Sequence, residues 1–277
     1  MFKTRLLSGI VLVLIALVTV IGGGNLLFAT VLIISLIGMN ELYKVFGIDK
    51  KAPGIIGYLG AILFYIGIYL DLYRNLFNEN PYFDAVDWPL MLTMVLVILL
   101  MASYVFAFPH YKTEQIVVAF FGVFYVAVML SYIFQTRILP GGVFSVWLVF
   151  LCSWGCDTCA YCTGMLIGKH KMAPVLSPKK SIEGAVGGVV GAALLGVLYG
   201  CAINHWGGAN VSVAGYAIVC AAGALISMVG DLAASAIKRN HEIKDYGTLI
   251  PGHGGILDRF DSVIFTAPII YYLVALL

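Results

Sequence analysis

The sequence is poor in charge, and this scarcity excludes an ordinary soluble domain. Only 11% of its 277 residues are Asp, Glu, Lys or Arg, whereas 61% are hydrophobic. Soluble domains carry about 25% charged residues. The mean hydropathy is +0.99, so the composition indicates a membrane protein.

Signature motifs of several enzyme classes are missing as well. The sequence has no Gly-x-x-x-x-Gly-Lys-Ser/Thr loop, no Gly-x-Ser-x-Gly elbow and no His-Glu-x-x-His pair. These absences argue against P-loop NTPases, α/β-hydrolases and zinc metalloproteases. The Asp-Gly-x-x-Ala-Arg pattern of CDP-alcohol phosphotransferases is also absent, which disfavours that class.

Cysteine occurs six times, and no long segment outside the membrane offers a disulfide framework. Four cysteines crowd into one apolar stretch at spacings that resemble those of metal ligands. Cys152, Cys156 and Cys159 stand at i, i+4 and i+7 on one helix face, where free cysteine acts as a small apolar packing residue. We therefore favour packing over a zinc or iron–sulfur site for the run from Cys152 to Cys162.

Long runs of apolar residues make up most of the chain. A helix needs about 20 mostly apolar residues to cross the ~30 Å hydrocarbon core. The stretches that meet this need are 6–21, 25–43, 54–73, 88–108, 114–133, 141–164, 184–204, 211–236 and 257–277. They are too continuous for barrel strands, which alternate apolar and polar residues. We expect an all-α polytopic membrane protein with about nine transmembrane helices.

The distribution of basic residues predicts the orientation. With nine helices and a cytoplasmic amino terminus, all Lys and Arg residues except Arg74 and Arg137 fall on the cytoplasmic side, a bias typical of inner loops. The first apolar stretch lacks a small-residue cleavage site, so we expect a retained helix. The compact length, without an amino-terminal extension, favours a bacterial inner membrane, with the active site facing the cytoplasm.

The residues that carry chemistry lie mainly in the second half. We expect a region of five sparse transmembrane helices over 1–136 and a catalytic region of four helices over 137–277. Two cytoplasmic loops, 165–183 and 237–257, stand out in the catalytic region. Loops held by a rigid scaffold are frequent sites of binding and catalysis. The predicted helix at 184–204 also carries Gly-x-x-x-Gly spacings, which fit a dimer contact or packing within one chain equally well.

A first candidate group lies at the inner end of the eighth predicted helix. Asp231, Ser235 and Lys238 are spaced i, i+4 and i+7, so their side chains line one stripe. An aspartate within a membrane segment is costly unless it is paired, hydrated or bound to a cation. Taken alone, Asp231 remains open to three interpretations: a hydrogen-bonding group between helices, a proton or ion relay, or a metal ligand.

A glycine-rich turn precedes the ninth predicted helix. Gly252, Gly254 and Gly255 lack side chains and would let backbone N–H groups approach an anion at the helix start. Asp258 and Asp261 are spaced i, i+3 on the first turn, so they can point at a common divalent cation. Carboxylate oxygens suit Mg²⁺. The alternative for this pair is stabilisation of the helix dipole.

The third group is Asp157, in the sixth predicted helix, together with the loop that follows. Lysines there would serve as topology anchors on the simplest interpretation. Two prolines stiffen this loop, however, and Ser177 and Ser181 add hydroxyl donors. A rigid, basic, hydroxyl-bearing loop suits phosphate better than anchoring alone. Acidic, basic and glycine-rich elements on one membrane face fit phosphoryl or nucleotidyl transfer, whose transition state spreads negative charge over phosphate oxygens.

The order of these residues resembles the defining motif of the phosphatidate cytidylyltransferases (CDP-diacylglycerol synthases). The motif runs without a gap through Ser235-Ala-Ile-Lys238-Arg239, four further residues, Lys244-Asp-Tyr-Gly247, and Ile250-Pro-Gly-His253-Gly254-Gly255-Ile-Leu-Asp258-Arg259-Phe-Asp261. Also similar to that family are Asp157-Thr-Cys-Ala-Tyr161, Gly168-Lys169, Ser177-Pro-Lys179-Lys180-Ser181 and Glu183-Gly184. The resemblance is close over the second half, whereas the first five helices match only in being hydrophobic.

This resemblance implies transfer of CMP from CTP to phosphatidic acid, giving CDP-diacylglycerol and pyrophosphate in phospholipid biosynthesis. It implies a Mg²⁺-dependent homodimeric membrane enzyme; a second cation stays open, and no nucleic-acid partner is expected. The implied metal-site residues are Asp231, Asp258 and Asp261, and the catalytic set adds Lys238 and Arg259. The implied substrate-binding residues are Lys169, Ser177, Lys179, Lys180, Ser235, Arg239, Lys244, His253, Gly254 and Gly255. The cysteine-rich helix around Asp157 is the least typical part, so its role stays open.

Two rival functions share some of these features. A CTP-dependent lipid-alcohol kinase would use the same nucleotide at the membrane but would transfer a terminal phosphoryl group. An ion-coupled transporter would explain Asp157 and Asp231 within helices, but it would not explain the glycine-rich turn.

Overall fold

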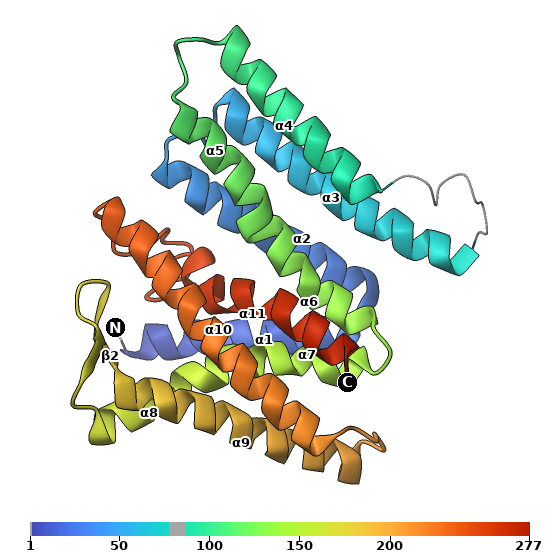
Figure 1. Ribbon diagram of the computed structural model, residues 1–277, viewed down its shortest axis with the longest axis vertical. Coiled ribbons are helices and arrows are strands. Elements are labelled where there is room, and N and C mark those ends of the chain that lie inside the picture. The colour runs from blue at the N-terminus through green and yellow to red at the C-terminus, as the bar shows by residue number, and fades with distance from the viewer. Residues whose placement is uncertain (1, 78–86) are drawn as a thin grey trace. The chain divides into compact units, whose positions relative to one another are not determined.

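The computed structural model describes residues 2–77 and 87–277, with side chains over 8–72 and 87–277, and most of these residues are helical (Figure 1). The uninterrupted helices are α1 (Phe2–Gly22), α2 (Gly24–Val45), α3 (Ala52–Phe77), α4 (Trp88–Phe106), α9 (Ile182–Trp206), α10 (Val213–Asn240) and α11 (Leu257–Ala275). Two further segments contain a π-helical turn: α5 (Thr113–Gly122), η1 (Val123–Val128) and α6 (Met129–Ile138), then α7 (Gly142–Phe150), η2 (Leu151–Gly155) and α8 (Cys156–Ile167).

Each apolar stretch of the sequence falls on one of these helical segments, which confirms the all-helical membrane fold. Within the described residues, seven segments are long and apolar enough to cross a membrane: α2, α3, α4, α5–α6, α7–α8, α9 and α10. Helix α1 contributes a shorter apolar run, Ser8–Gly22, and α11 begins with three charged residues in its first five. The count of nine spans and the orientation therefore remain predictions.

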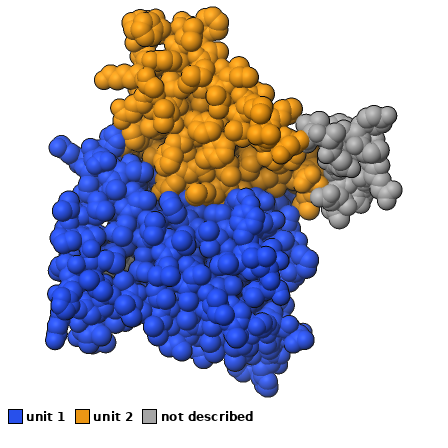
Figure 2. Space-filling model, viewed as in Figure 1, with its two compact units in different colours: residues 1–29, 132–277 blue, residues 30–131 orange. Residues whose placement is uncertain are grey.

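The chain forms two compact units (Figure 2). Unit 1 contains Met1–Ala29 and Tyr132–Leu277, and unit 2 contains Thr30–Ser131. The sequence predicts two regions divided at residue 136, and in the structure α1 packs against α7 and so joins the carboxy-terminal helices. All the predicted site residues lie in unit 1.

Unit 2 is held together by buried tyrosines that bond across helices. The hydroxyl of Tyr43 donates to the Ala119 carbonyl at 2.5 Å, and that of Tyr65 lies 2.8 Å from the Ser35 hydroxyl and donates to the Ala127 carbonyl at 3.3 Å. Polar groups at the depth of the membrane need such partners. The described part of this unit thus acts as a scaffold of apolar helices.

Small residues let the helices of unit 1 pack closely. Helix α8 lies along α9, α9 along α10, and α10 along α11. A Cβ atom at Gly188 would lie only 2.9 Å from the sulfur of Cys156 on α8, and one at Gly196 would lie 2.7 Å from the Tyr216 carbonyl on α10. The Gly-x-x-x-Gly spacings therefore serve packing within the chain, which confirms one of the two alternatives at these positions.

The cysteines of α7–α8 take part in the same packing. A Cβ atom at Gly223 on α10 would lie 2.7 Å from the Cys152 sulfur, and one at Gly191 on α9 would lie 2.5 Å from the Cys159 sulfur. Both cysteines therefore pack directly against a glycine of a neighbouring helix. Cys152 and Cys156 are fully buried, whereas Cys162 is exposed. The packing interpretation is confirmed for Cys152, Cys156 and Cys159.

Two connections on unit 1 carry the polar residues. The one between α8 and α9 forms an antiparallel hairpin of β1 (Lys171–Ala173) and β2 (Ser177–Ser181), which the sequence analysis did not predict. The Glu183 carboxylate closes its base by accepting the backbone N–H groups of Lys169 at 3.1 Å and His170 at 3.2 Å. The Ser181 hydroxyl caps α9 by accepting the Gly184 N–H. The second connection, residues 241–256, links α10 to α11 and is shorter than predicted because α10 continues to Asn240.

Candidate active site

Asp157 stands in the first turn of α8, immediately after the π-helical segment η2. A π-helical turn holds more residues than an α-helical turn and frequently occurs at functional sites. It rotates the following residues relative to α7. As a result Cys156 faces the buried side of α8, against Gly188, while its neighbour Asp157 lines a pocket.

Three carboxylates from three helices come together near this point. The Ser262 hydroxyl on α11 lies 3.5 Å from Asp157 Oδ2 and 3.4 Å from Asp261 Oδ1. The carboxylate of Asp231, on α10, interacts electrostatically with those of Asp157 and Asp261. We call Asp157, Asp231 and Asp261 the carboxylate cluster. Asp261 is buried and the other two are half-buried, so water screens their mutual repulsion only partly.

Lys180 brings a positive charge from the hairpin to this cluster. Its ammonium group forms an ion pair with Asp231 Oδ2, while Asp231 Oδ1 accepts a long hydrogen bond, 3.5 Å, from the Ser235 hydroxyl. About three quarters of each charged side chain in the ion pair is shielded from solvent. Strand β2 and helix α10 are therefore joined through opposite charges at the cluster.

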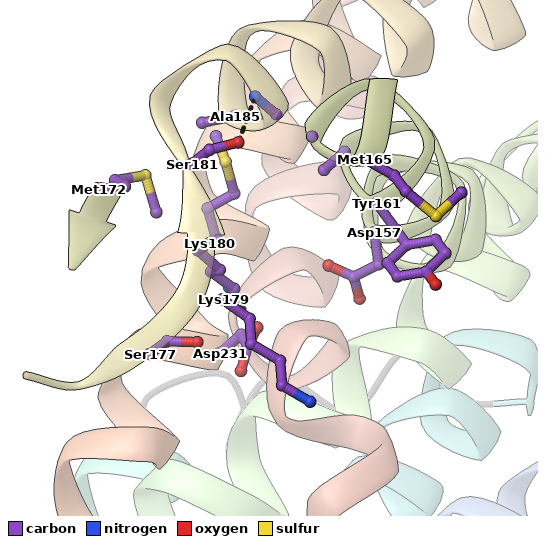
Figure 3. A pocket seen from close by; sticks show the side chains of 14 residues that line it. Asp157, Tyr161, Met165, Met172, Ser177, Lys179, Lys180, Ser181, Ala185 and Asp231 are labelled. Carbon is purple, nitrogen blue, oxygen red and sulfur yellow. Dashed lines mark hydrogen bonds and ion pairs between the residues drawn. The ribbon is translucent and has the colours of Figure 1, made fainter. Parts of the chain in front are cut away.

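The first pocket, which we call the hairpin pocket, opens between β2, α8 and α10 and has a volume of about 440 Å³. Figure 3 shows the Asp157 carboxylate on one side of it and the residues of β2 on the other. Its polar lining consists of Asp157, Ser177, Lys179, Lys180, Ser181 and Asp231. Its apolar lining includes Ala160, Tyr161, Met165, Met172, Ala185 and Met228. This pocket can therefore accept a molecule with an anionic end and an apolar end.

Asp258 is held by three hydrogen-bond donors, one of which, the Lys238 ammonium, also interacts electrostatically with Asp261 of the carboxylate cluster. Its Oδ1 accepts from Lys238 Nζ at 2.8 Å, and its Oδ2 accepts the backbone N–H groups of Tyr246 at 2.7 Å and Gly255 at 3.0 Å. The ammonium of Lys238 also lies over the Tyr246 ring, 5.3 Å from its centre. Asp258 thus joins the end of α10, the middle of the loop and the glycine-rich turn.

The glycine-rich turn shapes a second pocket. Gly252 and Gly254 adopt φ values of +77° and +86°, which favour glycine. The turn is closed by hydrogen bonds from Ile250 N to Gly254 O and from His253 N to Ile250 O. We call the adjoining cavity of about 470 Å³ the loop pocket. It is lined by Lys244, Asp245, Gly247, Thr248, Ile250, Gly252, His253, Gly254 and Arg259.

The predicted site residues divide into three sets. Ser177, Lys179, Lys180 and Asp231 line the hairpin pocket, and Lys244, His253, Gly254 and Arg259 line the loop pocket. The residues that line neither pocket are Lys169, Ser235, Lys238, Arg239, Gly255, Asp258 and Asp261. Arg259 connects the pockets electrostatically, because it also interacts with Asp157.

The predicted metal-binding set is regrouped by the structure. Asp231 and Asp261 interact electrostatically with each other and with Asp157, whereas Asp258 is hydrogen-bonded to Lys238 and the loop. Three donors from α10 and the loop hold Asp258, and a cation shared by Asp258 and Asp261 remains a prediction. The anion that accepts from the Gly255 N–H in the structure is the Asp258 carboxylate of the chain itself.

Two further contributors were not predicted from the sequence. Ser262 connects Asp157 to Asp261, and its position next to Asp261 was the only local signal. Ser8, on α1, has a hydroxyl 2.7 Å from His253 Nδ1. No local pattern indicates this contact, because 245 positions separate the two residues.

The donor chemistry of the carboxylate cluster fits Mg²⁺. Mg²⁺ takes one or two protein carboxylates, keeps several waters and completes its shell with substrate phosphate. Within the described part of the chain, no group of three or more His, Cys, Asp and Glu side chains has the arrangement of a complete metal site. Fewer than three of these carboxylates are therefore placed to serve one cation, a number that agrees with the one or two that Mg²⁺ takes from a protein.

The fold and the site together define a helical integral membrane protein with a charged site adjoining two pockets. A sequence model of the cytidylyltransferase family matches residues 3–277. Proteins named phosphatidate cytidylyltransferase from Staphylococcus saprophyticus and Staphylococcus aureus are 29% and 31% identical to the chain, over 269 and 273 residues. Another with this name, from Staphylococcus epidermidis, is 30% identical over 270 residues, and each alignment covers 97% of both sequences. The chain belongs to the cytidylyltransferase family and is a nucleotidyltransferase.

Proposed function

We propose that the chain transfers CMP from CTP to phosphatidic acid, with Mg²⁺, releasing pyrophosphate and forming CDP-diacylglycerol. The names of the relatives support these substrates. The observation that carries the proposal is the carboxylate cluster, which adjoins an amphipathic pocket and is linked through Arg259 to a polar one. Two anionic substrates need such a site, because their mutual repulsion must be offset by fixed positive charge and by a cation.

The hairpin pocket suits phosphatidic acid. Lys179 and Lys180 can pair with the phosphate monoester, while the methionines and Tyr161 offer an apolar wall to the glycerol and acyl chains. Tyr161 and Met165 are 69% and 67% exposed on the outer surface of α8. A lipid can therefore approach this pocket along an apolar helix face.

The loop pocket suits the triphosphate of CTP. Lys244 and Arg259 supply fixed positive charge, and His253 supplies a ring nitrogen beside them. Arginine binds phosphate oxygens through two parallel N–H donors. The Arg259 backbone carbonyl accepts from the Trp154 indole N–H at 3.4 Å, which ties the first turn of α11 to η2.

The reaction needs no activated side chain as nucleophile. A phosphate oxygen of phosphatidic acid attacks the α-phosphorus of CTP, and the bond between that phosphorus and the bridging oxygen to the β-phosphate breaks. The electron pair of that bond leaves with pyrophosphate. Lys180 and Arg259 orient the two anions and stabilise the developing charge. Mg²⁺ would be held by one or two carboxylates of the cluster together with substrate phosphate, and it would neutralise charge on the nucleotide phosphates.

Product analysis with labelled CTP tests this proposal. Purified protein is incubated with phosphatidic acid, Mg²⁺ and CTP labelled at the α- or the γ-phosphate. Cytidylyl transfer places α-label in the lipid and γ-label in pyrophosphate. A lipid kinase would instead place γ-label in the lipid, and a transporter would give no labelled lipid at all. Asp231→Asn should abolish lipid labelling, whereas Asp49→Asn, a matched control in unit 2, should not.

The remaining expectations belong to the same proposal. We infer that the enzyme is a homodimer in a bacterial inner membrane, with both pockets on the cytoplasmic side. Light scattering on detergent-solubilised protein tests the dimer. Labelling of a cysteine placed at Thr248 in a cysteine-free background, in intact cells and in inverted vesicles, tests the side. Labelling in intact cells by an impermeant reagent would place the pockets outside the cytoplasm.

A further inference from the structure

The amino-terminal helix reaches the glycine-rich turn through Ser8. The Ser8 hydroxyl donates to the Pro251 carbonyl at 3.1 Å and lies 2.7 Å from His253 Nδ1. A Cβ atom at Gly9 would lie 3.8 Å from His253 Cε1 and 3.9 Å from Nε2. The imidazole ring therefore packs over the backbone of α1 while it lines the loop pocket.

The contacts of Ser8 with Pro251 and His253 favour one position of the ring proton. A serine hydroxyl has a single proton, and a carbonyl oxygen can only accept. If that proton goes to the Pro251 carbonyl, the short contact with His253 Nδ1 requires the ring to donate its Nδ1–H to the serine oxygen. This arrangement satisfies both contacts at once. It also remains intact when the ring is protonated at both nitrogens.

We propose that Ser8 is a positioning residue that holds the His253 ring with Nδ1–H toward α1 and Nε2 on the side of the loop pocket. In the imidazolium form, Nε2–H can then donate to a phosphate oxygen of the nucleotide. The role in nucleotide binding rests on the proposed function, whereas the ring orientation does not. The orientation of a second ring nitrogen is commonly set by the hydrogen bond at the first.

Steady-state kinetics test this role. Ser8→Ala should lower kcat/KM for CTP about tenfold, the effect of losing one charge-assisted hydrogen bond, and should leave KM for phosphatidic acid unchanged. Ser8→Thr keeps a hydroxyl and should retain most of the activity. Thr19→Val is the matched control, because the Thr19 hydroxyl on the same helix bonds to the Ile15 carbonyl of its own helix.

A double variant separates action through His253 from simple anchoring of the loop through Pro251. In a His253→Ala background, Ser8→Ala should cause less than about a twofold further loss, because a residue that acts only through another has no effect once the other is removed. A full additional tenfold loss would overturn the proposal and assign Ser8 to loop anchoring.

Nitrogen NMR gives a readout that does not depend on turnover. With ¹⁵N-labelled histidine, and with His253→Gln to assign the signal, the neutral ring of His253 should show Nδ1 as the protonated nitrogen. Ser8→Ala should reduce that tautomer. A ring protonated at Nε2 in the unaltered chain would overturn the proposal. An Nδ1–H ring in a protein that cannot use CTP would instead refute the proposed function and leave the orientation by Ser8 standing.

Discussion

Replacement of Asp258 by asparagine separates a metal-binding role from a structural one. The change removes the negative charge that faces Lys238 and leaves one acceptor oxygen for two backbone N–H donors, those of Tyr246 and Gly255. The Asp258 side chain is 1% exposed and that of Lys238 is 13% exposed, so solvent compensates the unpaired ammonium poorly.

The magnitude follows from the cost of breaking a buried ion pair from one side, which is about 3–5 kcal/mol. Since the asparagine side chain would keep one acceptor oxygen, we expect a loss of about 3 kcal/mol, at the low end of that range. A change of this size lowers the unfolding midpoint of a chain of this length by about 6–12 °C. Cytidylyl transfer should fall by several orders of magnitude, because the unpaired Lys238 ammonium and the weakened acceptor disturb the turn that shapes the loop pocket.

Thermal unfolding in detergent, followed with a thiol-reactive fluorophore, measures the stability change. Cys152, Cys156 and Cys220 are buried and react only as the helices separate. The double variant Lys238→Met, Asp258→Asn should recover most of the midpoint without recovering activity, because no charge is left unpaired. Glu242→Gln, an exposed residue of the same loop, is the control. An unchanged midpoint for Asp258→Asn would refute the structural role, and near-normal turnover would refute any role in the site.

Three further variants test the packing, the ion pair and the hairpin. Gly188→Ala should lower the unfolding midpoint by several degrees, because the new Cβ would lie 2.9 Å from a cysteine sulfur on α8. Gly200→Ala should be tolerated, because its Cβ would meet its nearest atom at 3.4 Å. Equal midpoints for the two variants would contradict the packing account. Lys180→Met should lower kcat about 100-fold or more, whereas Lys179→Met, at an exposed position, should lower it only a few-fold. Equal losses would show that the ion pair between Lys180 and Asp231 has no special role in turnover. Glu183→Gln should loosen the hairpin base and raise KM for phosphatidic acid several-fold at nearly constant kcat, and an unchanged KM would exclude the hairpin from lipid binding.

The helices and the polar stripes could be predicted because local spacing determines them. Asp231, Ser235 and Lys238 follow one face of α10 as their i, i+4, i+7 spacing requires. The long apolar runs likewise correspond to the helical segments of the structure. Such patterns depend only on residues a few positions apart, so the sequence displays them directly.

The grouping of the acidic residues could not be predicted because tertiary contacts decide it. Asp258 and Asp261 are three positions apart, yet Asp258 accepts from the loop residue Tyr246 whereas Asp261 accepts from Ser262. Asp157 joins the cluster through Ser262, and the preceding π-helical turn sets the face of α8 that Asp157 occupies. These outcomes depend on contacts between residues 12 positions apart, for Tyr246 and Asp258, and 105 apart, for Asp157 and Ser262, which local spacing does not contain.

The contact of the first helix with the glycine-rich turn also could not be predicted from the sequence. Ser8 lies in the half of the chain that carries few polar residues, and only the packing of α1 within unit 1 brings it to His253. The β-hairpin was not predicted, because Pro174 and Pro178 indicate only a stiff loop and a proline within a run of residues argues against a strand. In the structure Pro178 lies within the short strand β2, at an edge where the missing N–H is tolerated.

Cation binding by the carboxylate cluster is the central claim, and electron paramagnetic resonance of Mn²⁺, used in place of Mg²⁺ in the presence of CTP, tests it most directly. The account predicts that Asp157→Asn, Asp231→Asn and Asp261→Asn each weaken Mn²⁺ affinity at least about tenfold, while Asp49→Asn leaves it unchanged. Asp258→Asn in the stability-restored Lys238→Met background should affect Mn²⁺ affinity less than the cluster variants do. Unchanged affinity in all three cluster variants, with a loss only on removal of Asp258, would contradict the account.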